Sequence, residues 1–440
     1  MDLAPHLAER YFAVHDGALW IGGVAAAELA ARYGTPLYAY DLSVMDHKWE
    51  VLRSALPPEF SIFYSVKANP NRTILQHFLR KGAGLEIASA GEFSRALSAG
   101  CPPQNTVFAG PGKTPSELER VVREGIGEIH VESVREAQRV DAFARQCGKR
   151  ARIAVRVNPG GDAEGGAMRM GGRPAPFGVD EENLDEVLQA LLRLTSLEIR
   201  GIHVFTGTQI LDCEILAAQY RKGLDIARRA ASHLERLYTV DFGGGLGIPY
   251  FSHEQELDMR GLRDALEDLF APVRRDPVFA QTRFFVEPGR FLTGEAGIYV
   301  VRVNDIKISR GKKFLIVDGG MNHHLAASGN LGQTIKRNYP VALLNKIGCP
   351  AEETVDVVGP LCTPLDVLGR GVSLPQAEVG DLLGVFQSGA YGRSASPLHF
   401  LSHPAPPEVS IYCGQHELIC PRGEGADSAA LPREDALHEI

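Results

Sequence analysis

The chain has 440 residues, 44% of them hydrophobic and 23% charged, and this ordinary globular composition excludes a disordered, collagenous or coiled-coil protein. Lys and Arg total 46 against 54 Asp and Glu, so the net charge of −8 gives no basic surface for nucleic acid. No apolar run approaches the ~18 residues that cross a bilayer, and the N-terminus lacks the apolar core of a signal peptide, so we expect a cytoplasmic protein with no membrane partner.

Strand-like apolar runs alternate with amphipathic, helix-like stretches between about residues 60 and 290. The eight runs are SIFYSV (61–66), GLEIA (84–88), TVFAG (106–110), EIHVES (128–133), ARIAVRVN (151–158), RGIHVFTG (200–207), YTVDFGGG (238–245) and RFFVEPG (283–289). Among the stretches between them, TPSELERVVREG carries a helix-start signal, a hydroxyl residue followed by an acid. This alternation predicts a (β/α)8 TIM-like barrel with a parallel core, an α/β fold, and a doubly wound open sheet is the structural alternative.

The segments on either side of the barrel have a different residue pattern. After residue 290 the apolar runs are short, β-branched and interrupted by Gly, Pro and Asn, which predicts an all-β domain. The early segment YFAVHDGALWIGG (11–23) predicts a hairpin that could pair with the C-terminal strands. We therefore expect a barrel over 36–295, a β domain built from 1–35 and 296–420, and a polar tail over 421–440.

Catalytic groups in a barrel lie at the C-terminal ends of the strands. Those ends contain Lys67, Glu86, Arg156, His203, Gly243–Gly245 and Glu287. At the barrel mouth the Lys67 amine would be partly desolvated, which favours the neutral form that can form a Schiff base. The alternative is an ordinary lysine whose amine reaches solvent.

The segment DFGGGLGIP (241–249) places a glycine cluster directly after the seventh strand. Closely spaced glycines let backbone amides approach a phosphate, and barrels tend to bind phosphate after strands 7 and 8. The cluster does not fit the GxGxxG dinucleotide pattern, so it predicts a single phosphate, and a plain tight turn is the alternative.

Glu287 ends the eighth strand in the mostly apolar run FFVEPG, and a buried carboxylate needs a cationic or hydrogen-bonding partner. A protonated ring nitrogen would serve, and so would a nearby arginine such as Arg156. His203, in GIHVFTGTQ, could stack on a flat cofactor ring or be a hydrogen-bonded core histidine.

Seven scattered cysteines without a CxxC pair predict neither a zinc site nor a disulfide framework. Cys362 follows a predicted turn in GPLCTPLD, with Asp366 four residues on, and simple burial is the alternative for this thiol. Tyr391, in GAYGRSAS, is flanked by glycines, which suits either an exposed contact residue or a plain turn.

Taken together, the ordered segments YSVKAN, LEIASAGE, HVFTGTQ, DFGGGLG, EPGR, GPLC and GAYG resemble the fold type III decarboxylases that use pyridoxal 5′-phosphate (PLP). Diaminopimelate and ornithine decarboxylases belong to this family, and the resemblance runs from about residue 35 to about residue 415. The segment MRMGGRPAPFGVD (168–180), with HVFTGTQ and CTPLD, is similar to a subgroup of natural-product and exopolysaccharide pathways. One relative in that subgroup, from butirosin biosynthesis, decarboxylates a glutamyl unit tethered to an acyl carrier protein.

The resemblance implies a role for each matching residue. Lys67 would hold PLP as a Schiff base, His203 would stack on its ring, and Glu287 would keep the ring nitrogen protonated for loss of CO2. Cys362 would assist reprotonation in the active site of the partner subunit, which implies a homodimer with shared active sites. The other cofactor contacts would be Glu86, Arg156, Thr206, Gly244, Gly245, Gly289, Arg290 and Tyr391.

One departure from the family concerns the substrate. In the diamino-acid decarboxylases the residue after the cysteine is acidic and binds the distal ammonium, whereas here it is Thr363, which cannot replace a carboxylate. The candidate substrate contacts are Arg290, Arg337 in RNYPV, Thr363 and Tyr391. We expect a carboxy-lyase acting on an amino acid or a carrier-linked derivative, not on a free diamino acid.

Three alternatives stand beside this hypothesis. The first is a diaminopimelate decarboxylase of lysine biosynthesis. The second is a non-catalytic partner-binding relative, like the antizyme inhibitors, but such proteins lose the lysine or the cysteine that this chain keeps as Lys67 and Cys362. The third is a racemase built from a barrel and a β domain, against which the GPLC and EPGR motifs argue.

Overall fold

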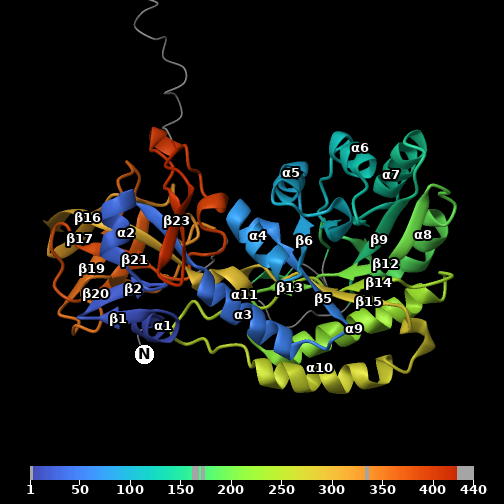
Figure 1. Cartoon of the computed structure of the whole chain (residues 1–440), viewed down its shortest axis with the longest axis horizontal. Coiled ribbons are helices and arrows are strands. Elements are labelled where there is room, and N and C mark those ends of the chain that lie inside the picture. Colours follow the sequence, from blue (N-terminus) through green and yellow to red (C-terminus); the bar gives the residue numbers. More distant parts are fainter. Residues whose placement is uncertain (1–2, 161–167, 170–173, 332–335, 424–440) are drawn as a thin grey trace, which may run out of the picture. The chain divides into compact units, whose positions relative to one another are not determined.

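The computed structural model describes residues 3–160, 168–169, 174–331 and 336–423, and the chain divides into two compact units (Figure 1). One unit comprises His47–Pro249 and Glu254–Leu292, and the other comprises Met1–Asp46, Tyr250–His253 and Thr293–Ile440. Within the described part of the chain, no helix combines the length and the apolar character that crossing a bilayer requires.

The first unit is a closed barrel of eight parallel strands. In chain order these are β5 (Phe60–Ser65), β6 (Gly84–Ile87), β7 (Thr106–Phe108), β8 (Glu128–Val131), β9 (Ala151–Asn158), β12 (Leu197–Val204), β14 (Thr239–Asp241) and β15 (Arg283–Val286). Each strand pairs with the next one in this series, and β15 pairs with β5 through Phe285 and Ser61 to close the ring. All eight predicted strands are confirmed, and the alternative of an open sheet is wrong because the last strand bonds to the first.

Helices follow the strands and cover the outside of the barrel (Figure 1). They are α4 (Arg72–Arg80), α5 (Ala90–Ser98), α6 (Pro115–Glu124), α7 (Val134–Gln146), α8 (Leu184–Leu191), α9 (Cys213–Ala231) and α10 (Met259–Val273). The helix α3 (Leu42–Ala55) precedes β5, and the short α11 (Arg290–Thr293) follows β15. The helix-start signal before α6 is confirmed as a capping box between Thr114 and Glu117, with Pro115 in the first turn and Gly125 left-handed at the end.

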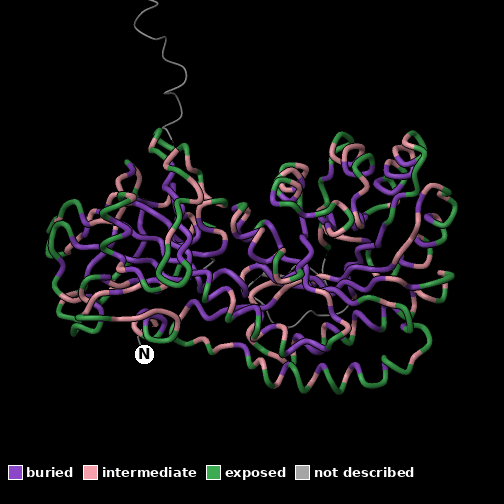
Figure 2. The backbone as a smooth tube through the Cα atoms, in the orientation of Figure 1, coloured by how far each residue is buried: buried purple, intermediate pink, exposed green. Residues whose placement is uncertain are grey.

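The barrel strands are almost wholly buried, as Figure 2 shows, because helices cover their outer face and side chains fill the interior. Phe60 on β5 packs against Phe284 on β15 and against Phe270 on α10, with ring centroids 5.7 and 4.8 Å apart. Short strands complete the unit. The strand β11 (Val179–Asp180) pairs in parallel with β9, and β10 (Met168–Arg169) pairs antiparallel with β13 (Gly207–Thr208).

The second unit is β-rich, as the sequence predicts. Its larger sheet is ordered β20 (Val367–Leu374), β19 (Glu353–Val358), β17 (Lys312–Val317), β16 (Gly297–Ser309), β4 (Leu37–Asp41), β22 (Glu408–Tyr412) and β23 (Gln415–Cys420). Two more strands, β18 (Val341–Leu343) and β21 (Leu382–Val385), pair with each other, and β21 pairs with β16.

The N-terminal residues depart from the sequence-based expectation in three respects. The predicted hairpin is present as β1 (Ala13–His15) and β2 (Ala18–Ile21), but it pairs with β3 (Val24–Ala25) in a sheet of its own. Two helices, α1 (Leu3–Tyr11) and α2 (Ala26–Tyr33), flank it. The strand β4, expected in a barrel starting at residue 36, lies between β16 and β22 in the β unit.

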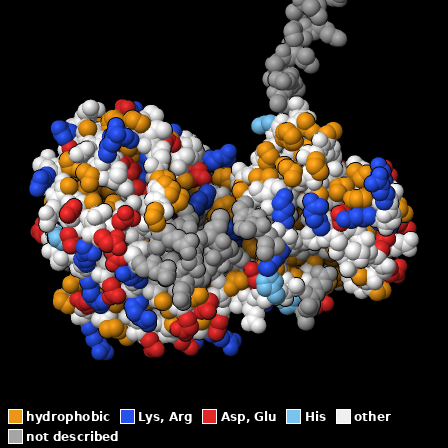
Figure 3. Space-filling view, turned by 180° about the vertical axis from the view of Figure 1, so that it is seen from behind, with side chains coloured by type: hydrophobic (Ala, Val, Ile, Leu, Met, Phe, Trp, Pro, Cys, Tyr) orange, Lys and Arg blue, Asp and Glu red, His pale blue; other side chains and the backbone are white. Residues whose placement is uncertain are grey.

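The polar tail predicted over 421–440 lies outside the described residues from position 424 onward. On the face drawn in Figure 3, acidic and basic side chains are interspersed, which agrees with the absence of a basic stripe from the sequence.

Candidate active site

Lys67 lies in a 3₁₀ turn, η1 (Val66–Ala68), directly after β5. Its Nζ donates a hydrogen bond of 2.8 Å to Oε2 of Glu86 on β6, and the Ser65 hydroxyl donates to the same oxygen at 2.5 Å. The Glu86 side chain is only 1% exposed whereas that of Lys67 is 44% exposed. Burial would raise the pKa of Glu86, but the Lys67 charge and these two hydrogen bonds hold it below its ordinary value. A buried, ionised carboxylate therefore fixes the Lys67 amine, while the exposed part of the side chain stays in contact with solvent.

Glu287 directly follows β15 and is buried. Its backbone N–H donates to the Gly243 carbonyl at 2.7 Å, and its carboxylate Oε2 lies 3.6 Å from Nε2 of His203. Burial, followed by the charges of Asp241 and Glu86, raises the pKa of Glu287 well above its ordinary value. Arg156 forms its ion pair with Glu132 at 2.8 Å, so the alternative in which Arg156 neutralises Glu287 is not what the structure shows.

His203 lies on β12 with its ring buried. Its ring centroid is 4.5 Å from that of His130, and the two planes are inclined by 39°. Burial, followed by the positive charges of His130 and Arg156, lowers the pKa of His203 well below its ordinary value. The ring is therefore neutral at physiological pH and presents a flat π surface in the barrel.

Three polar side chains of this region escaped the sequence analysis: Glu128 and His130 on β8, and Asp241 on β14. His130 Nε2 lies 3.3 Å from Glu128 Oε1 and 3.9 Å from Asp241 Oδ2, and its Nδ1 lies 3.9 Å from Glu287 Oε1. The alternation in EIHV was an available signal, because residues two apart on a strand share a face. The search of strand ends missed Glu128 and His130 because they lie before the end of β8, and it missed Asp241, which ends β14, because it took the glycines that follow as the feature of that strand end.

Comparison with known proteins assigns the family. The sequence model described as "Pyridoxal-dependent decarboxylase, pyridoxal binding domain" matches residues 42–294, more than half of the chain. The chain belongs to this family. It is a PLP-dependent amino-acid decarboxylase, and the predicted fold class, cofactor and enzyme class are confirmed.

Two curated relatives and one crystal structure show the extent of the similarity. The "L-glutamyl-[BtrI acyl-carrier protein] decarboxylase" of Niallia circulans is 41% identical over 406 residues, 91% of this chain and 94% of that protein. A diaminopimelate decarboxylase of Aquifex aeolicus is 34% identical over 426 residues, 97% of this chain and 98% of that protein. The structure of the M. jannaschii diaminopimelate decarboxylase in complex with L-lysine has a TM-score of 0.88 at 27% identity, covering 97% of this chain and 99% of that one.

The barrel residues of the decarboxylase fit PLP. The Thr206 hydroxyl and Glu287 Oε1 are buried and make no hydrogen bond to any described residue, an arrangement that costs free energy unless a further group supplies the partner. A ring N–H and a hydroxyl or phosphate group of the cofactor have the required chemistry. His130, His203 and Glu287 also hold potential ligand atoms within 4.8 Å of one another, but membership of a PLP family favours an aromatic ring over a metal ion as their neighbour.

The glycine cluster has a packing reason in the structure. A Cβ on Gly244 would lie 2.5 Å from the Glu287 carbonyl oxygen, and Gly243 has a φ of +65° that favours glycine. Gly245 (φ +99°) also needs glycine, and a Cβ on Gly289 would lie 2.8 Å from the Ala68 Cβ. Gly244 lets the turn after β14 approach the backbone of Glu287. Gly289 lets the loop after Glu287 approach the turn that carries Lys67. Their phosphate contacts, with Arg290 at the start of α11, stay a prediction.

Four predicted site residues belong to the β unit: Arg337, Cys362, Thr363 and Tyr391. Cys362 is exposed, and the Thr363 hydroxyl accepts from the Leu365 amide at 3.3 Å. Arg337 lies 2.8 Å from His253 Nε2. Tyr391 has a φ of +54°, a strained conformation of the kind that clusters at functional sites.

The β-unit loop that carries Cys362 is held by a buried carboxylate. Asp366 accepts hydrogen bonds from the amides of Met321 and Leu361 at 2.6 and 2.8 Å. Two loops are thereby joined, and the turn predicted before Cys362 has a defined shape.

A buried ion pair supports β8 from outside the site. Lys113 Nζ donates to Glu136 Oε1 at 2.6 Å and to the carbonyl oxygens of Gly110 and His130 at 2.7 Å each. All three ammonium protons therefore have partners. Burial nevertheless lowers the pKa of Lys113, against the opposing effect of Glu136.

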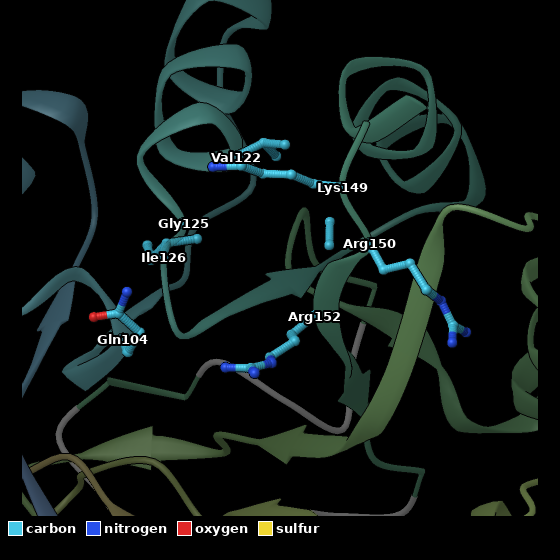
Figure 4. A pocket seen from close by; sticks show the side chains of 8 residues that line it. Gln104, Val122, Gly125, Ile126, Lys149, Arg150 and Arg152 are labelled. Carbon is cyan, nitrogen blue, oxygen red and sulfur yellow. The ribbon is translucent and has the colours of Figure 1, made fainter. Parts of the chain in front are cut away.

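The barrel unit also contains a hollow of about 300 Å³ that is separate from Lys67 and Glu287. Figure 4 shows the side chains that line it. Its lining includes Gln104 before β7, Ile126 before β8 and Arg152 at the start of β9. These positions are the amino ends of the strands, whereas Lys67 and Glu287 follow the carboxyl ends. The hollow is therefore not the decarboxylase site.

Proposed function

We propose that this decarboxylase acts on an amino acid whose far end is acyl-linked, the chemistry of an aminoacyl unit on a carrier protein, and not on a free diamino acid. The observation that carries the proposal is Thr363 in the position after Cys362. Its hydroxyl already accepts a hydrogen bond from the Leu365 amide, and it has no charge to pair with a distal ammonium. The 41% identical relative is named for a glutamyl unit on an acyl carrier protein, which supports a substrate of this class.

The geometry of the barrel and the family resemblance support the following residue roles. Bound PLP supplies an electron sink for the electron pair left by loss of CO2. Lys67 holds the cofactor covalently, with Glu86 fixing the position of its amine. Glu287 would hold the proton on the ring nitrogen, and the neutral His203, 3.6 Å from Glu287, would pack against the cofactor ring.

Further residues complete this assignment. The remaining cofactor contacts are Arg156, Thr206, Gly244, Gly245, Gly289, Arg290 and Tyr391. The substrate contacts are Arg290, Arg337, Thr363 and Tyr391. Cys362 gives the proton from its Sγ to the α-carbon after CO2 leaves. It does so in the site of a second copy of this chain, so the active unit is a homodimer with shared sites.

A second candidate is a diaminopimelate decarboxylase, which the 34% identical Aquifex relative and the M. jannaschii structure favour. The two candidates separate in one experiment. Purified protein with PLP is incubated with L-glutamyl-carrier protein, free glutamate, lysine, ornithine and meso-diaminopimelate, and CO2 release is followed. We expect release from the carrier-linked unit. A kcat/KM of about 10⁴ M⁻¹s⁻¹ or more on free meso-diaminopimelate, within the ordinary enzyme range, would refute the proposal.

The role of Thr363 has its own test. Thr363→Glu places a carboxylate where the diamino-acid enzymes carry one, so the ratio of kcat/KM for lysine or diaminopimelate to that for the carrier-linked unit should rise by about 10-fold or more. Thr363→Gln is the matched control, since it has the same size and loses the same hydroxyl but adds no charge. If both variants shift the ratio equally, the distal charge is not what Thr363 controls.

A further inference from the structure

The buried polar groups of the barrel leave an unbalanced set of carboxyls. Glu86 is balanced by Lys67, Glu132 by Arg156 and Glu136 by Lys113, each within 2.8 Å. Glu128, Asp241 and Glu287 remain, all buried, and no described lysine or arginine forms an ion pair with them. Three buried carboxyls without counter-charges would be costly, so protons must be held among them.

His130 is the group placed to hold such a proton. One ring nitrogen faces Glu128 and Asp241, and the other faces Glu287, at the distances of 3.3 to 3.9 Å given above. Glu128 also accepts a hydrogen bond of 2.9 Å from the Thr239 hydroxyl, which fixes its carboxyl group beside His130. The His130 ring is wholly buried, and neither of its nitrogens makes a hydrogen bond to a residue that the structure describes, so it differs from a core histidine whose nitrogens both have partners.

We propose that His130 is a positioning residue for decarboxylation: its imidazole supplies the proton that Glu128, Asp241 and Glu287 need between them, and so keeps Glu287 ionised against the ring nitrogen of PLP. His130 acts through Glu287 and does not touch the reacting atoms.

The surrounding charges give the sign of the effect. Burial and the charges of Glu128 and Glu86 raise the pKa of Asp241 to about 7, so this carboxyl competes for the same proton. The positive charge of His130 lowers the pKa of Glu287, opposing burial, Asp241 and Glu86. The charge of Lys67 also lowers the pKa of Glu287. The charges of Arg156 and Lys113 lower the pKa of the neighbouring His203 ring. Removing the His130 charge therefore raises the pKa of Glu287, and ionisation of Glu287 moves to higher pH.

The test uses the holoenzyme and a readout other than turnover. The absorbance of bound PLP and kcat are each followed between about pH 5 and pH 9 in the wild type and in His130→Gln. The glutamine side chain stays neutral over this pH range and cannot take up a proton as histidine does. We expect the acid-side midpoint of both curves to rise by about one pH unit, since a charge at this distance acts through little water. We also expect KM to change by less than about threefold, because the substrate does not contact His130.

Further variants separate positioning from structure. Glu128→Gln removes the carboxylate that faces His130 Nε2 and also the charge that raises the pKa of Asp241, so its own shift has no single sign. The shift in the double variant should nevertheless differ from the sum of the two single shifts, because both residues act on the same carboxyls. His77→Gln, at a buried histidine of α4 outside the site, is the control that should leave the midpoint in place. An unchanged midpoint in His130→Gln, even with reduced activity, would overturn the proposal, and so would single shifts that simply add in the double variant. If His130→Gln does not fold, His130→Asn, which also carries a neutral amide, is titrated in its place.

Discussion

Replacing Lys113 with Met should destabilise the barrel unit through one identifiable loss. The ammonium of Lys113 donates three hydrogen bonds inside the protein, and methionine fills a similar volume without donating any. The variant therefore leaves Glu136 buried without its cation and leaves two carbonyl oxygens, those of Gly110 and His130, without this donor.

The size of the effect follows from the burial of the pair. The Lys113 and Glu136 side chains are 1% and 8% exposed, so solvent cannot replace the lost partner. Breaking a buried ion pair on one side costs about 3–5 kcal/mol. With a denaturant slope of ~3 kcal/mol/M in urea, a loss of ~4 kcal/mol lowers the unfolding midpoint by ~1.3 M.

Tryptophan fluorescence can report this unit alone. The chain has two tryptophans, Trp20 in the β unit and Trp49 in the barrel unit, so a Trp20→Phe background leaves Trp49 as the probe. Urea unfolding is measured for Lys113→Met, with Arg123→Met as the matched control on α6. The Arg123 ion pair with Glu119 has exposed side chains and should contribute less than about 1 kcal/mol.

Two results would refute this reasoning. A Lys113→Met midpoint equal to that of Arg123→Met would mean that the buried pair contributes no more than a surface pair. A Lys113→Met/Glu136→Gln double variant should recover part of the loss, because it removes the orphaned charge. If the double variant loses the sum of both single effects, the orphaned carboxylate is not the cause.

Three further predictions concern the active site. Borohydride reduction of the holoenzyme should fix the cofactor on Lys67, and Lys67→Ala should show neither the attachment nor activity; peptide mapping to another lysine would contradict the assignment. Glu287→Gln should still bind PLP, while kcat falls by about 100-fold or more, and near-normal turnover would show that its charge is not needed at the ring nitrogen. Mixing inactive Lys67→Ala with inactive Cys362→Ala should restore up to about a quarter of wild-type activity, because one of the two sites in a mixed symmetric dimer has both native residues. No recovery despite demonstrated subunit exchange would place Cys362 in its own subunit's site or outside the site.

The barrel was predictable because its signal is local and repeated. Each strand is a short apolar run bounded by turn residues, and the strand-end rule found Lys67, Glu86, His203 and Glu287. The strand β4 was misassigned for the opposite reason, since LYAYD adjoins the barrel in sequence and only its long-range pairing with β16 and β22 places it in the β unit.

The electrostatic partners in the site were less predictable than the residues themselves. Glu132 is near Arg156 because β8 and β9 are neighbours, and nothing in the spacing of the two residues along the chain shows it. His130 lies inside β8, where a polar residue among apolar ones gives no direction toward a ligand, and Asp241 ends β14 directly before the glycine cluster on which the prediction for that strand end rested. Their relation to Glu287 requires the closed ring of strands, because the three residues come from three strands or strand ends.

The central position of β4 has a consequence for the order in which the chain can fold during synthesis. Tyr38 on β4 pairs with Tyr299 on one side and with Glu408 on the other. Strand β4 therefore leaves the ribosome with both of its strand partners still unmade, whereas every strand of the barrel is complete once residue 286 has emerged. Contacts this distant in sequence form late and slowly, and the edge of β4 that pairs with β22 must stay unpaired until translation is almost finished.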